Sequence, residues 1–77
     1  MFKKEYQIVN LSDLNKIDTE TVNPSILKEQ GLVKYALRPI KILGEGDIDK
    51  KINITASAFS SSAIKKIEKA GGTATAQ

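Results

Sequence analysis

The sequence contains no cysteine and no histidine, and these two absences remove most enzymatic chemistry. Without cysteine the chain can form no disulfide, thiol nucleophile or thiolate zinc site. Without histidine it lacks the commonest general base, the commonest metal ligand and the side chain that normally titrates between about pH 5 and 8. We therefore expect no enzymatic activity, no metal, no cofactor and no small-molecule substrate.

Aromatic residues are also scarce, at 5% of the chain. They are Phe2, Tyr6, Tyr35 and Phe59, and Phe59 is expected in the core. Proteins that read unpaired bases usually stack them on clustered aromatic side chains. Because these rings are too few for a stacking platform, base-specific reading of single strands is not expected.

Long apolar runs are missing as well. No segment approaches the roughly 18 apolar residues of a membrane-spanning helix. The first five residues, Met-Phe-Lys-Lys-Glu, lack the apolar stretch of a secretory signal peptide. These features predict a cytoplasmic protein without a membrane partner.

What the chain does contain is typical of a small globular protein. Of its 77 residues, 40% are hydrophobic and 27% are charged, which predicts a single domain over residues 1–77. The net charge is +3, and it is unevenly distributed. Residues 1–30 carry four lysines against five acids, whereas residues 31–77 carry seven lysines and Arg38 against four acids. A surface that faces phosphate should therefore lie in the second part of the chain.

The first part of the chain predicts a strand and a single helical turn. In the run 6–11, apolar residues stand at both even and odd positions, which is typical of a strand buried on both faces. Ser12 is the predicted cap of the helical turn that follows. The residues of that turn expected to face the core are Leu11, Leu14 and Ile17.

Residues 23–31 carry every signal of a short helix. Asn23 is a preferred N-cap, and Pro24 occupies the first helical position, where its missing N–H costs nothing. Gly31 is the expected left-handed terminator. The stretch 32–37 that follows is ambiguous.

Short strands are predicted at residues 40–43 and 52–56, joined by a turn at residues 44–47. Ile52, Ile54 and Ala56 should share one face of the second of these strands. Residues 73–76 can form a final short strand.

The last helix is the clearest element, with Ser60 as its N-cap and Gly71 or Gly72 at its end. Phe59 is expected to pack on Ile64 as a hydrophobic staple. The helical period places four apolar residues on one side, namely Ala63, Ile64, Ile67 and Ala70. It places three lysines on the other side, namely Lys65, Lys66 and Lys69.

Gly44 and Gly46 form part of a phosphate-binding pattern, but the pattern is incomplete. A dinucleotide-binding fingerprint needs a third glycine and an immediate helix, and a Walker loop needs Gly-Lys-Ser/Thr. The acids Glu45, Asp47 and Asp49 would repel phosphate. They also lack the bidentate glutamate of a calcium loop. We therefore predict a plain structural turn.

Ser62 and Lys65 have the Ser-x-x-Lys spacing of some nucleophilic enzymes. Nothing in the sequence activates the serine, and Lys65 is expected to face solvent together with Lys66. A small hydrolase is the weakest of the functional hypotheses.

Clusters of lysine and arginine residues are the best functional feature that composition alone reveals. They predict a broad, weak phosphate-binding surface, with a merely solvated helix face as the alternative. The predicted RNA-binding residues are Lys34, Arg38, Lys41, Lys50, Lys51, Lys65, Lys66 and Lys69.

The order of residues from 41 to 72 is distinctive. It reads Lys-Ile-Leu-Gly-x-Gly-x-Ile from residue 41, and Ile-x-Ile-x-Ala-x-x-Phe-Ser-x-x-Ala-x-x-x-Ile-x-x-x-Gly-Gly from residue 52. Together with the segments 6–14 and 23–32, this order resembles the C-terminal half of bacterial-type large-subunit ribosomal protein L15. The resemblance covers almost the whole chain.

The resemblance implies a small α/β domain of irregular strand–strand–helix turns, in which a short sheet is packed by short helices. It implies a structural constituent of the large ribosomal subunit that binds ribosomal RNA, contacts neighbouring ribosomal proteins and supports assembly without catalysis. In this interpretation Gly44 and Gly46 shape the turn between strands. The family also carries an N-terminal arm rich in Gly, Arg and Lys that this sequence lacks, so residues 1–77 are expected to be the C-terminal globular half of a longer protein. The competing hypothesis is a free-standing basic module that binds an acidic protein partner.

Overall fold

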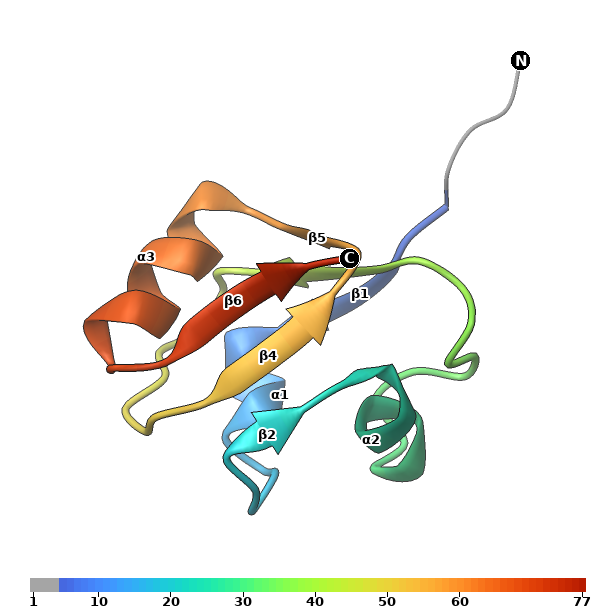
Figure 1. The fold of residues 1–77 in the computed structure, drawn as a ribbon, viewed down its shortest axis with the longest axis horizontal. Coiled ribbons are helices and arrows are strands. Elements are labelled where there is room, and N and C mark those ends of the chain that lie inside the picture. Colours follow the sequence, from blue (N-terminus) through green and yellow to red (C-terminus); the bar gives the residue numbers. More distant parts are fainter. Residues whose placement is uncertain (1–4) are drawn as a thin grey trace.

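The computed structural model of the chain describes residues 5–77, in which short strands and short helices follow one another along the chain (Figure 1). In chain order the elements are β1 (Gln7–Asn10), α1 (Leu11–Leu14), β2 (Thr21–Val22), α2 (Pro24–Glu29), β3 (Ile40–Leu43), β4 (Asn53–Ala56), β5 (Ala58–Phe59), α3 (Ser61–Lys69) and β6 (Thr73–Ala76). None of the helices in residues 5–77 is long and apolar enough to cross a membrane.

The strands form two parallel three-stranded sheets, and successive strands alternate between them. The first sheet has the order β1-β3-β5 and the second has the order β2-β4-β6. Gln7 lies opposite Ile40 in the first sheet, and Asn53 lies opposite Thr73 in the second. Figure 1 shows β2, β4 and β6 side by side, with α3 next to β6. The small α/β fold with short sheets and helices is confirmed, and the strand order, which the sequence left open, is now defined.

Ser57 is the residue at which the chain passes from one sheet to the other. It separates the end of β4 from the start of β5. Its backbone N–H donates to the carbonyl oxygen of Ile40 at 3.0 Å, and its hydroxyl accepts from the N–H of Ile40 at 3.1 Å. Both bonds fix the corner between β4 and β5 to the beginning of β3.

The core between these elements is aliphatic, and no polar or charged residue among residues 5–77 is buried. The predicted alternation of Ile52, Ile54 and Ala56 into the core is confirmed, since none of the three is more than 2% exposed. The other buried residues are Val9, Leu11, Leu14, Ile17, Val22, Leu27, Val33, Ile40, Ile42, Ile48, Ala63 and Ile67. The three residues predicted to face inward around α1 are among them.

The helix α2 begins and ends as predicted. The side chain of Asn23 accepts a hydrogen bond from the N–H of Ile26 at 2.9 Å, and Pro24 occupies the first position. Gly31, just beyond the end, has a φ of 78°. Six residues cannot hold a helix alone, and the fully buried Leu27 anchors it to the core.

Two predictions near the N-terminus are wrong. The strand β1 lies at the edge of its sheet, and its two faces are covered unequally: Val9 is buried, whereas Ile8 is 49% exposed. The N-cap of α1 is Asn10, and Ser12 lies inside the helix. The N–H of Asn10 donates to the carboxylate of Asp13 at 3.2 Å, which secures the start of the helix.

The helix α3 follows the predicted pattern except at its exposed rim. The hydroxyl of Ser60 accepts from the N–H of Ala63 at 3.2 Å, and Ala63 and Ile67 are buried. Ile64, which the helical period places on the apolar side of the helix, is 36% exposed and lies at the rim of that side. Phe59 is partly buried and packs against the core from outside, rather than lying within it.

Candidate nucleic-acid interface

The predicted RNA-binding residues occupy three places in the fold. These are helix α3, with Lys65, Lys66 and Lys69; the segment before β4, with Lys50 and Lys51; and the segment at the start of β3, with Lys34, Arg38 and Lys41. Their side chains differ in a property that the sequence does not reveal, namely whether the cation is already bound to the protein's own backbone.

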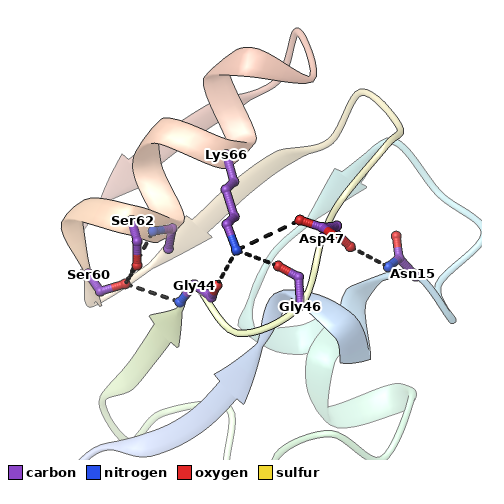
Figure 2. Close-up of polar contacts among 8 residues, drawn as sticks. Asn15, Gly44, Gly46, Asp47, Ser60, Ser62 and Lys66 are labelled. Atoms are coloured by element: carbon purple, nitrogen blue, oxygen red, sulfur yellow. Dashed lines mark hydrogen bonds and ion pairs between the residues drawn. The ribbon is translucent and has the colours of Figure 1, made fainter.

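Lys66 is turned inward onto the loop that joins β3 to β4 (Figure 2). Its ammonium donates to the carbonyl oxygens of Gly44 and Gly46, both at 2.8 Å, and lies 3.8 Å from a carboxylate oxygen of Asp47. The prediction that Lys66 faces solvent beside Lys65 is therefore wrong. Its charge is committed to three groups of its own chain.

The loop at residues 44–47, which we call the glycine loop, is attached on several sides. The N–H of Gly44 donates to the hydroxyl of Ser60 at 3.1 Å. On the opposite side, the side-chain amide of Asn15 donates to the carbonyl of Asp47 at 2.6 Å. Anion-binding loops present free N–H groups to their ligand. The glycine loop presents carbonyl groups to an ammonium, so it connects α1 with α3 and does not form a phosphate cradle.

Both glycines of this loop are required by close packing. A Cβ on Gly44 would lie 2.8 Å from the backbone N of Ala63 and 2.9 Å from the carbonyl carbon of Ser62. Gly46 has a φ of 86°, and a Cβ there would lie 2.7 Å from the Cβ of Ser12. The loop therefore holds the starts of α1 and α3 close together only if both positions lack a side chain.

Lys50 is also engaged within the chain. Its ammonium donates to the carbonyl of Asn15 at 3.1 Å and to the carbonyl of Ile17. These carbonyls follow the end of α1, where a cation satisfies oxygen atoms left without a helical partner. Of the adjacent pair predicted to meet phosphate, only Lys51 is exposed, and Lys50 is partly buried.

Two other exposed lysines of the predicted set, Lys51 and Lys69, have acidic neighbours. Lys69 lines a shallow groove that also includes Asp47. Lys51 lines another one together with Asp18 and Glu20. Nearby carboxylates weaken the attraction that an isolated lysine exerts on phosphate.

A different arrangement surrounds residues 34–38, which are held by the side chain of Gln7 on β1. The amide oxygen of Gln7 accepts from the N–H groups of Lys34 and Tyr35, both at 3.0 Å. The amide nitrogen donates to the carbonyl of Tyr35 at 2.7 Å and to that of Arg38 at 3.4 Å. One side chain thus satisfies four backbone groups of a loop that lacks regular structure. Sequence reasoning missed Gln7, because no local pattern connects it to residues 34–38.

Aromatic and cationic side chains meet at this loop. The guanidinium of Arg38 lies 4.0 Å from the centre of the Tyr35 ring, and the ammonium of Lys41 lies 5.9 Å from that of Tyr6. Both tyrosines line a groove of about 530 Å³. The rings of Tyr6 and Tyr35 are dispersed in the sequence but gathered in the fold. Phe2, the remaining aromatic residue of the N-terminal part, lies outside the described residues.

Comparison with known protein families supplies the class of this protein. Residues 7–75 match the family described as ribosomal proteins 50S-L15, 50S-L18e and 60S-L27A. The match covers most of the chain, so the chain belongs to this family, and the resemblance seen in its sequence is confirmed. It is a protein of the large ribosomal subunit, with a structural role in the translating ribonucleoprotein and a location on the ribosome in the cytoplasm.

Proposed function

We propose that the chain binds large-subunit ribosomal RNA through its exposed cations, contacts neighbouring ribosomal proteins and thereby supports assembly of the subunit. Residues 1–77 act in this role as one domain, without catalysis. Family membership supports the ribosomal context. The net charge of +3 supports a polyanionic partner.

One observation carries the RNA-binding proposal. In the segment that begins β3, Lys34 and Arg38 are exposed and Lys41 lies nearby over an aromatic ring. Within the part of the chain that the structure describes, the groove beside them is lined by a single acidic residue, Glu5. We therefore place the principal phosphate contacts at this segment and at Lys65 of α3, and assign Lys50 and Lys66 to the fold.

The test is a salt titration of binding to a fragment of large-subunit ribosomal RNA. Each phosphate contact contributes a slope of about −0.9 in log K against log salt on a duplex, so a total slope of magnitude about 2–4 is expected. The double variant Lys34→Gln/Lys41→Gln should reduce that slope by about one unit for each lost contact. The matched control is Lys51→Gln, which changes a lysine with acidic neighbours and should have a smaller effect.

The competing function, an interaction module for an acidic protein, uses the same cations. Polyglutamate and the RNA fragment should therefore be compared as competitors. If the RNA fragment competes for the protein's cations at a far lower concentration of charge than polyglutamate does, the proposed function is supported. Equal displacement by polyglutamate, or the absence of RNA binding at low salt, contradicts it.

A further inference from the structure

The groove beside β1, which we call the tyrosine groove, contains features that phosphate binding alone does not require. It is lined by Glu5, Tyr6, Gln7, Ile8, Leu32, Val33, Lys34, Tyr35 and Arg38. We propose that the tyrosine groove receives one or two unpaired nucleotides of RNA, whose bases stack on Tyr35 and Arg38 while their phosphates meet the surrounding cations. This inference rests on the proposed RNA binding and specifies the form of RNA that this part of the surface recognises.

The size and composition of the groove fit a nucleotide. Its volume of about 530 Å³ lies within the range of small-ligand sites, roughly 300–1,000 Å³. Its walls combine aromatic rings with aliphatic side chains such as Leu32 and the half-exposed Ile8. A base offers a flat apolar face with a polar edge, and such a mixed wall can accept both.

The rings provide the stacking surface. Tyr35 is 47% exposed, although the guanidinium of Arg38 lies 4.0 Å from its ring centre. Arg38 is itself exposed, so both the ring and the guanidinium over it remain accessible to a further flat group. Unpaired bases stack on both kinds of plane, and cation–π attraction from arginine strengthens the contact.

The loop that carries these groups is held in place before any ligand arrives. The side chain of Gln7 makes four hydrogen bonds to the backbone of Lys34, Tyr35 and Arg38. Since the loop does not have to be ordered upon binding, more of the contact energy appears as affinity. A loop with a purely structural role would not need to hold a tyrosine and an arginine exposed at its surface.

The charges around the groove favour a polyanion. Lys34 and Arg38 line it, and Lys41 lies over the ring of Tyr6 at 5.9 Å. Among residues 5–77, Glu5 is the only acidic residue in the lining, and it is exposed to solvent. A duplex would meet these cations through its phosphates but would leave the tyrosine faces unused, because its bases are stacked inside the helix.

The composition of the chain allows binding in the tyrosine groove to be followed by intrinsic tyrosine fluorescence. The sequence has no tryptophan and only two tyrosines, and both line this groove. Intrinsic tyrosine fluorescence therefore reports on the groove alone. We expect a short single-stranded oligoribonucleotide to quench this emission as its bases stack on the rings. The duplex formed with its complementary strand should bind the protein, as measured by anisotropy of a labelled strand, with much weaker quenching.

Two variants test the stacking contact. Tyr35→Ala should weaken binding of the single strand by about 5- to 150-fold, which corresponds to 1–3 kcal/mol for one base. Tyr35→Phe keeps the stacking ring and should retain affinity within about threefold of the unmodified chain, a range smaller than the loss of one stacked base. Duplex binding should be nearly unchanged in both. Thermal melts of both variants verify that the fold is intact, as expected for an exposed residue.

The outcomes separate this inference from the proposed function. If the duplex binds with salt dependence but the single strand neither binds more tightly nor quenches tyrosine emission, RNA binding stands and the nucleotide site is wrong. The same conclusion follows if Tyr35→Ala and Tyr35→Phe bind equally well; the exposed rings would then belong to a protein interface. If neither form of RNA binds at low salt, the proposed function fails as well.

Discussion

Neighbouring lysines with similar sequence environments have opposite roles in this protein. Lys65 extends into solvent from α3, whereas Lys66 binds the carbonyl groups of Gly44 and Gly46. The helical period assigns both to the polar side, because it describes only rotation about the helix axis. Which lysine contacts the glycine loop depends on where that loop packs, and this is decided by the tertiary structure. The kind of residue at the interface could therefore be predicted from the sequence, but not which cations remain available.

This difference predicts unequal effects of one conservative change. Lys66→Gln should lower the free energy of unfolding by about 1–2 kcal/mol, because two charge-assisted hydrogen bonds are lost at a partly exposed site. Lys65→Gln should change it by less than about 0.5 kcal/mol, as for ordinary surface positions. Urea denaturation of both variants measures the difference. Equal stability of the two would show that the bonds from Lys66 to the glycine loop contribute nothing in solution.

The glycine loop gives a second prediction at the residue scale. Gly44→Ala should destabilise the protein by about 2–3 kcal/mol, since the new Cβ has no room beside α3. Gly31→Ala should cost only about 1 kcal/mol, because space is open there and only the left-handed backbone is strained. Removing the nearest side chain with Ser62→Ala should not rescue Gly44→Ala, because backbone atoms lie 2.8 and 2.9 Å from the added carbon. Rescue by Ser62→Ala would contradict this packing.

Among the elements, those defined by local signals could be predicted and those defined by neighbours could not. The helix α2 carries a side-chain cap, a proline at its first position and a glycine terminator, and all three act within a few residues. The strand β1 has apolar residues at both odd and even positions, yet one of its faces is only partly covered within residues 5–77, where Ile8 is 49% exposed. The tyrosine groove was missed for the same reason, since Gln7 and Tyr35 are brought together only by the pairing of β1 with β3.

The rotation of α3 about its axis can be tested with two isoleucines. Ile67 is 1% exposed and Ile64 is 36% exposed. Ile67→Ala should therefore cost about 2–5 kcal/mol of folding free energy, as for other buried aliphatic side chains. Ile64→Ala should cost distinctly less than Ile67→Ala, because 36% of Ile64 is already exposed to water. Thermal or urea unfolding provides the measurement, and similar costs at the two positions would mean that the helix is rotated from its described orientation.

The whole molecule is organised by the alternation of its two sheets. Strands β1, β3 and β5 form one sheet and β2, β4 and β6 the other, so neither sheet can be completed by a continuous stretch of chain. Every strand pair is parallel and therefore joins segments that are distant in the sequence. Short-range patterns contain no information about such pairing, which explains why the strands could be predicted and their order could not. Two sheets built in this way should unfold as a single unit.

Removal of β6 tests this cooperativity. Deleting residues 73–77 takes away the backbone partners that β4 and Ile52 have on the β6 side, including the N–H of Thr73 that donates to Ile52 and the N–H of Gln77 that donates to Ala56. We expect the truncated chain to lose most of its stability, with circular dichroism and tyrosine emission changing together at one denaturant midpoint. The matched control is Thr75→Ala, which changes an exposed side chain but keeps all backbone pairing and should cost less than about 1 kcal/mol.

The position of the tyrosines makes the test decisive. Tyr6 directly precedes β1, and Tyr35 is bound through its backbone to Gln7 of β1, so both report on the first sheet. The deletion removes a strand of the second sheet only. If the sheets were independent, the tyrosine transition would keep its midpoint in the truncated chain while the circular dichroism signal decreased. A shared core and the corner at Ser57 connect the sheets, so we expect the tyrosine transition to shift to lower denaturant as far as the circular dichroism transition does.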